Sequence, residues 1–192
     1  MAERVKKRSE IREQDTWKLE DMIASPEKFE ELADGVEERI PGYETYRGKL
    51  GSSADLLKSY LEFDESMDET ISLLYAYAMQ KRDQDTSVSE NQALVSRVQS
   101  LAVKAMAASS FAQPEILEIP DETMNGFLET DELKAYKLQI ERLLAKKLHM
   151  LSEKEEAILA SASEIAHTPS SVFSLFNNAD LKFDPVEDEN GE

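Results

Sequence analysis

The chain has 192 residues and 41% of them are hydrophobic, so it is long enough to bury a core, and disorder along its whole length is not expected. It carries 40 acidic residues against 22 basic ones, a formal net charge of −18, and such a surface repels nucleic-acid phosphates and anionic membranes. Cysteine is absent, which excludes a disulfide framework and a thiolate metal site.

The beginning of the chain, from Met1 to Gln14, is charged and lacks the apolar stretch of a signal peptide. Nowhere do apolar residues run for the roughly 20 positions that a membrane helix needs. We therefore expect a cytoplasmic protein with no membrane partner and no nucleic-acid partner.

Residues 1–15 are polar and predict a flexible N-terminal arm. Trp17, the single tryptophan, opens the first apolar group, and we expect it to anchor this segment onto the helices rather than to bind a ligand. Ser25, Pro26 and Glu27 are typical of a helix start, because serine caps, proline suits the first helical position and glutamate favours the positive end of the helix dipole.

A long second helix is predicted to begin at Ser53 as its N-cap and to end between residues 83 and 86. Its apolar stripe includes Tyr75. Tyr77 lies off the stripe and is predicted to face a partner or a groove. Aromatic residues at this spacing are more typical of a core than of a ligand site.

A third helix is predicted after residue 86, because Ser87 and Glu90 have the spacing of a capping box. Pro114 is predicted to close it. Further caps and apolar periodicity predict a short helix from Pro120 and more helices up to about residue 180.

These elements predict an all-α fold, an antiparallel array of about six or seven helices. We expect an N-terminal helical subdomain at residues 16–112 and a second helical segment of the same domain at residues 113–180. A short strand is predicted at residues 181–183, and Asn190-Gly191 is typical of a hairpin turn. Residues 181–192 are therefore either an acidic tail or the start of a truncated hairpin that leads to an absent catalytic domain.

Motifs that carry chemistry are scarce. The chain has no His-Glu-x-x-His pattern, no Gly-rich phosphate loop and no nucleophile elbow. Glu164 and His167 form one half-site of a di-iron bundle, but the second pair is missing because Lys146 stands three residues before His149. We interpret both histidines as residues near helix C-termini, and predict no catalytic, cofactor-binding or metal-binding residue in this chain.

Short segments along the chain have a characteristic order and spacing. They are TWKLED at 16–21, YRGKL at 46–50, YAY at 75–77 followed by Asp83, Asp85 and Thr86, LSEKEE at 151–156, and PSSVFSLFNNADLKF at 169–183 with DENG at 188–191. Together they resemble the N-terminal region of oligoendopeptidase F, a bacterial zinc metallopeptidase of the thimet-like M3 group. The resemblance covers residues 15–192, and the stretch at 169–183 is its most specific part.

The resemblance implies a parent protein that hydrolyses short peptides at an enclosed zinc site. The ligands expected there, a His-Glu-x-x-His pair and a downstream glutamate, have no counterpart in residues 1–192, so zinc is expected in the parent protein and no cofactor in this chain. The N-terminal helices of such enzymes wall the substrate chamber and help to exclude folded proteins. We therefore expect a non-catalytic domain whose partner is the C-terminal catalytic domain of the same protein.

The alternative is a freestanding helical module that binds a protein or peptide without enzymatic activity, since such a bundle can fold alone. If instead the chain is one domain of a peptidase, the surface that meets the catalytic domain is uncovered here. An uncovered interface predicts an exposed apolar patch, with either self-association through it or displacement of the tail after Phe183. A di-iron bundle ranks last.

Overall fold

The computed structural model describes residues 10–85, 88–147, 169, 172–173 and 176. The chain divides into two units, Val5–Ala145 and a second one formed by Met1–Arg4 with Lys146–Glu192. The architecture below is that of the first unit.

Every regular element in the described residues is a helix, which confirms the all-α fold class for that part of the chain. The helices predicted after residue 148 and the hairpin predicted at residues 181–192 lie outside the described residues. The predicted number of helices and the predicted boundaries at residues 112 and 180 therefore stay predictions.

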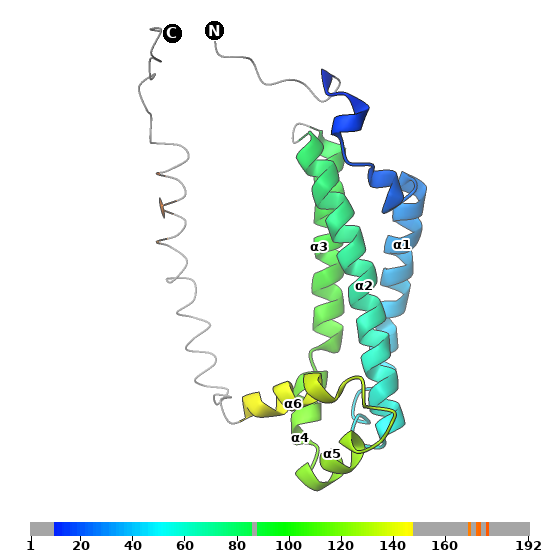
Figure 1. The fold of residues 1–192 in the computed structure, drawn as a ribbon, viewed down its shortest axis with the longest axis vertical. Helices are drawn as coiled ribbons and strands as arrows, with labels where there is room; N and C mark the ends of the chain where they lie inside the picture. The colour runs from blue at the N-terminus through cyan, green and yellow to red at the C-terminus, as the bar shows by residue number, and fades with distance from the viewer. Residues whose placement is uncertain (1–9, 86–87, 148–168, 170–171, 174–175, 177–192) are drawn as a thin grey trace. The chain divides into compact units, whose positions relative to one another are not determined.

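Figure 1 shows the helices in chain order. The 3-10 helices are η2 (Glu13–Asp15), η3 (Leu19–Asp21) and η4 (Ile40–Thr45), and the α-helices are α1 (Pro26–Arg39), α2 (Ala54–Gln84), α3 (Ser89–Ser109), α4 (Ala112–Glu118), α5 (Asp121–Leu128) and α6 (Lys137–Lys146). Within the described part of the chain, none of the helices is long and apolar enough to cross a bilayer.

Helices α1, α2 and α3 lie side by side, and the chain reverses its direction from each to the next (Figure 1). α2 is 31 residues long and packs mainly against α3, while α1 packs against both. Helices α4, α5 and α6 gather at the end where α2 begins (Figure 1). The core that joins them is apolar and includes Phe29, Leu57, Leu74, Val98, Met124, Leu133 and Ile140.

The N-caps of the first two α-helices are the predicted serines. The Oγ atoms of Ser25 and Ser53 each accept a hydrogen bond from the backbone N–H three residues later, at 3.3 and 3.2 Å. Each bond satisfies a donor that the helix leaves unpaired. The prediction for α3 was wrong, because its N-cap is Val88, which makes no side-chain cap. Valine suits the extended backbone at this position, so the helix starts one residue later than the capping box at Ser87 indicates.

Pro114 does not close α3 as predicted. α3 ends at Ser109, and Pro114 lies in the first turn of the next helix, α4. The first-turn amides of a helix have no intrahelical partner, so a proline there removes no hydrogen bond. The residue is therefore part of a helix start rather than of a helix end.

Tyr75 and Tyr77 have exchanged their predicted roles. The side chain of Tyr77 is 3% exposed and that of Tyr75 is 41% exposed. The ring of Tyr77 lies 5.7 Å from that of Phe29 on α1. Because α1 and α3 both pack on α2, the buried face of α2 is wider than a single stripe, and Tyr77 belongs to it.

Ion pairs connect α1 to α3. Arg97 Nη2 lies 2.5 Å from Asp34 Oδ1, and Arg97 Nε lies 3.3 Å from Glu30 Oε2. Two turns further along both helices, Lys104 pairs with Glu37. The residue numbers rise together on the two helices, so α1 and α3 run parallel to each other with α2 antiparallel to both.

The ion pair of Glu37 and Lys104 makes a pH-dependent contribution. The hydrogen bond from Lys104 and the attraction of its charge lower the pKa of Glu37 below its ordinary value. A group with a depressed folded pKa stabilises the fold above its unfolded pKa, and this contribution is lost as the pH falls through the folded pKa.

We therefore expect Lys104→Met to raise the pKa of Glu37 toward its ordinary value, because the hydrogen bond and the charge of Lys104 are its two largest causes of lowering. A carbon-detected NMR titration of the side-chain carboxyl measures it. Lys58→Met, which removes the partner of Glu62 on α2, is the matched control and should leave Glu37 unchanged. An unaltered Glu37 titration in Lys104→Met would show that the pair does not form in solution.

Candidate functional site

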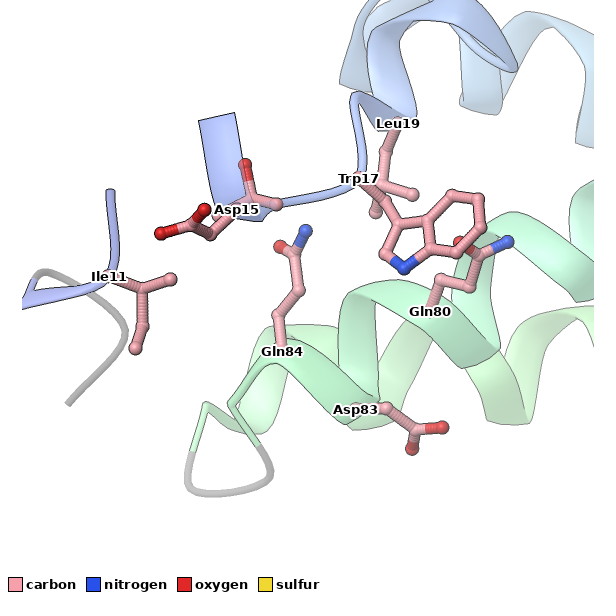
Figure 2. A pocket seen from close by; sticks show the side chains of 8 residues that line it. Ile11, Asp15, Trp17, Leu19, Gln80, Asp83 and Gln84 are labelled. Carbon is pink, nitrogen blue, oxygen red and sulfur yellow. The ribbon is translucent and has the colours of Figure 1, made fainter. Parts of the chain in front are cut away.

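A pocket of about 420 Å³ lies where residues 11–15 and the leading segment (residues 16–23) meet the C-terminal end of α2. Figure 2 shows side chains that line it, with Trp17 on the leading segment beside Gln80 on α2. The lining residues include Ile11, Asp15, Trp17, Leu19, Gln80 and Gln84. The pocket therefore combines one large aromatic ring with side-chain amides.

The leading segment is not anchored by Trp17, whose side chain is 84% exposed, so that prediction was wrong. Leu19 and Ile23, each 2% exposed, anchor it instead. The 3-10 helix η3 and the hydrogen bond from Ile23 N to Leu19 O (3.1 Å) place these two aliphatic side chains one turn apart on the same side. Trp17 precedes that turn and remains on the surface.

The charged groups near this pocket are already paired. Asp15 Oδ2 lies 2.8 Å from Arg12 Nε, and Asp83 Oδ1 lies 2.8 Å from Arg82 Nη2. The pocket offers a ligand the exposed indole of Trp17 and the amide of Gln84, which suit stacking and hydrogen bonding, whereas Gln80 Nε2 already donates to Met22 Sδ at 3.3 Å. These groups do not form the nucleophile and base pair that covalent catalysis needs.

The turn at residues 46–50 is held by a carboxylate from far along the chain. Glu115 on α4 accepts one hydrogen bond on each oxygen, from Gly48 N to Oε2 (2.8 Å) and from Leu50 N to Oε1 (2.7 Å). Gly48 has a φ of 75°, a left-handed conformation that glycine adopts at little cost. The guanidinium of Arg47 lies 4.4 Å above the ring of Phe111, beside this turn. The YRGKL segment therefore has a structural role in this domain.

A groove of about 340 Å³ lies between α2 and α3. Its floor is apolar and includes Met67, while Asp64 and Asp68 supply carboxylates. The hydroxyl of Tyr43 donates a hydrogen bond to Asp64 Oδ1 at 2.7 Å. Burial, together with this hydrogen bond and the charge of Asp64, raises the pKa of Tyr43 well above its ordinary value, so the phenol remains a donor.

Metal ligands do not come together in the described part of the chain, where no three His, Cys, Asp or Glu side chains lie close enough to hold a metal ion. Catalytic zinc takes three such ligands and a water. The half-site residues Glu164 and His167, and also His149, lie outside the described residues. The donor sets that the structure describes do not fit a catalytic zinc.

Comparison with known proteins gives consistent matches. A family model described as Oligopeptidase F matches residues 115–183. The chain is 42% identical over 185 residues to oligopeptidase PepF of Bacillus subtilis, with 96% of this chain and 28% of that protein covered. It is 40% identical over 189 residues to an oligoendopeptidase F homolog of Lactococcus lactis, with 97% and 31% covered. This chain matches the N-terminal part of these oligopeptidase F proteins.

Two solved structures also match this chain. The crystal structure of oligoendopeptidase-F from Enterococcus faecium matches with a TM-score of 0.62 and 34% identity, covering 88% of this chain and 33% of that one. A peptidase from Chlamydophila abortus matches with a TM-score of 0.75 over 98% of this chain and 32% of that one, and at 24% identity it supports the fold alone. The chain spans about a third of the length of these oligoendopeptidase F relatives or less.

Two of the segments that carried the resemblance to oligoendopeptidase F fall on structural features described above. The segment at 16–21 borders the pocket of Figure 2, and the segment at 46–50 is the turn that Glu115 holds. The segments at 151–156 and 188–191, and most of the segment at 169–183, lie outside the described residues. Glu115 itself was not identified from the sequence, although a left-handed glycine turn with free amides is a signal that an acceptor must lie nearby.

Proposed function

We propose that this chain is the non-catalytic N-terminal helical domain of a zinc metallopeptidase of the oligoendopeptidase F type, which hydrolyses short peptides. The observation that carries the proposal is the pairwise match with the Bacillus subtilis oligopeptidase, which runs over 96% of this chain and 28% of that protein. In this proposal the zinc and its ligands belong to the remainder of the polypeptide, which this chain does not include.

Within such a peptidase, this domain walls the substrate chamber. The packing of α1, α2 and α3 supports this role, because antiparallel helices fixed by a shared core and by ion pairs form a stiff wall. A stiff wall limits the size of what reaches an enclosed site. The domain then contributes to the choice of short peptides over folded proteins without taking part in the bond cleavage.

A chimera tests the assignment. The part of Bacillus subtilis oligopeptidase PepF that matches this chain is replaced by this chain, and hydrolysis of a quenched fluorogenic peptide is measured with and without a zinc chelator. We expect chelator-sensitive hydrolysis from the chimera, and none from this chain alone or from PepF lacking the matching part. Zinc-dependent hydrolysis by this chain alone would contradict the proposal.

The chamber role has a separate readout. The chimera and PepF are each given a short peptide and a folded protein that carries the same cleavable sequence in a surface loop. We expect both enzymes to cleave the peptide and to leave the folded protein intact. A chimera that cleaves the folded protein as fast as the peptide would show that this domain does not enclose the site.

A further inference from the structure

The α2–α3 pair has two long faces, and in the described part of the chain α1 packs over one of them. On that covered face, Arg97 and Lys104 of α3 form the ion pairs with α1. At 3.6 residues per turn, Ala102 and Met106 lie about half a turn away from Lys104, on the opposite face. The α2–α3 groove of about 340 Å³ is on this opposite, open face.

The open face has the shape and side chains that receive a helix. Ala102 and Ser109 on α3 are small, so the backbone of a neighbour can come close. Met106 is 64% exposed, and its flexible thioether adapts to an apolar partner. Tyr75 lies one turn after Ile71 on α2 and is 41% exposed, so it extends the apolar surface beyond the groove.

The charge of the open face selects the partner. Among the described residues, those that line the groove include the phenol of Tyr43, the carboxylates of Asp64 and Asp68, and no basic side chain. On the covered face, by contrast, the α2–α3 pair contributes basic residues from α3, and α1 contributes the carboxylates that pair with them. A helix that docks on the open face meets acidic walls, so its flanking residues have to be basic. A second copy of this chain is disfavoured because each copy has a net charge of −18.

We propose that the α2–α3 groove is the docking surface for a basic amphipathic helix from the remainder of the same polypeptide. The inference rests on the proposed function, and the length of the relatives supports it. This chain covers 28% of the Bacillus subtilis oligopeptidase, so more than two thirds of such a protein is left to supply the helix. The groove then attaches this N-terminal domain to the catalytic part of the protein.

Thiol protection tests the docking surface, because the chain has no cysteine of its own. Met106→Cys and Leu138→Cys are prepared both in this chain alone and in the PepF chimera, and maleimide labelling at each position is followed by peptide mass spectrometry. Leu138 is the control, since it is 59% exposed, lies on α6 and does not line the groove. We expect position 106 to react at least about tenfold more slowly in the chimera than in the isolated chain, and position 138 to react equally in both.

The charge argument is tested in the same chimera. Adding Asp68→Lys should restore fast labelling at position 106, because it places a cation where the basic helix docks. Adding Glu69→Lys is the matched control, since Glu69 is the adjacent exposed acidic residue and is not part of the groove lining. Equal labelling with both lysine variants would overturn the basic character of the partner.

The other outcomes separate the two proposals. An active chimera in which position 106 labels as fast as in the isolated chain overturns the docking surface and leaves the proposed function standing. An inactive chimera, with PepF itself active, counts against the proposed function and removes the basis of the inference. Concentration-dependent protection of position 106 in the isolated chain identifies a second copy as the occupant and overturns the inference.

Discussion

Tyr77→Ala should lower the free energy of unfolding by about 3–5 kcal/mol, as truncation of a large buried aromatic side chain does. The side chain is 3% exposed on α2 and its ring packs against Phe29 of α1. Its removal leaves a cavity at the place where α1 meets α2. Urea denaturation followed by far-ultraviolet circular dichroism measures the effect, because the described elements are all helical.

The control for Tyr77 stands two residues away. Tyr75 has the same side chain on the same helix, but it is 41% exposed, so Tyr75→Ala should change the free energy of unfolding by less than about 1 kcal/mol. The apolar pattern of the sequence predicts the reverse order of effects for these two tyrosines. If Tyr75→Ala proved the more destabilising variant, the register of α2 described here would be wrong.

Glu115→Ala should be the second most damaging change, at about 2–4 kcal/mol, because it removes two charge-assisted hydrogen bonds of about 1.5–3 kcal/mol each and part of that is recovered by water. Leu50 is fully buried, and its N–H is left without its acceptor. Glu115→Gln should have a smaller effect, since an amide keeps one acceptor oxygen of the two. Urea denaturation again gives the free energies.

Two comparisons assign this effect to the turn. Glu118→Ala changes an exposed glutamate on the same helix and should be close to neutral. Gly48→Ala should cost about 1 kcal/mol, because φ is 75° there and a Cβ disfavours the left-handed region. Combined with Glu115→Ala it should be less than additive, because both residues shape one turn. Full additivity would show that the carboxylate acts elsewhere.

Local signals along the chain predicted the helices well. Ser25 and Ser53 cap helices as predicted, because serine before a helix start satisfies a free backbone amide wherever the chain later packs. A short helix beginning at Pro120-Asp121 was also predicted, and the structure has it from Asp121 to Leu128. Helix existence is a local property, so it can be inferred without knowledge of the tertiary structure.

The surfaces of those helices were harder to predict, because the neighbours decide them. The hydrophobicity of Tyr75 and Tyr77 is the same, and only the position of α1 determines which one is buried. Trp17 was expected to be an anchor because of its size, yet the turn at Leu19 directs the smaller aliphatic side chains inward. The hydrogen bond from Gly48 to Glu115 joins residues 67 positions apart, which no local pattern indicates.

The position of Trp17 determines what can be seen by fluorescence. It is the single tryptophan and is 84% exposed in the folded chain, so its emission hardly differs between the folded and unfolded states. A thermal melting curve recorded by tryptophan fluorescence therefore does not detect the unfolding of the helical core. Because the indole is exposed at the pocket between the leading segment and α2, its fluorescence responds to changes at the leading segment. A ligand or partner that covers this pocket should quench the Trp17 emission or shift it to the blue.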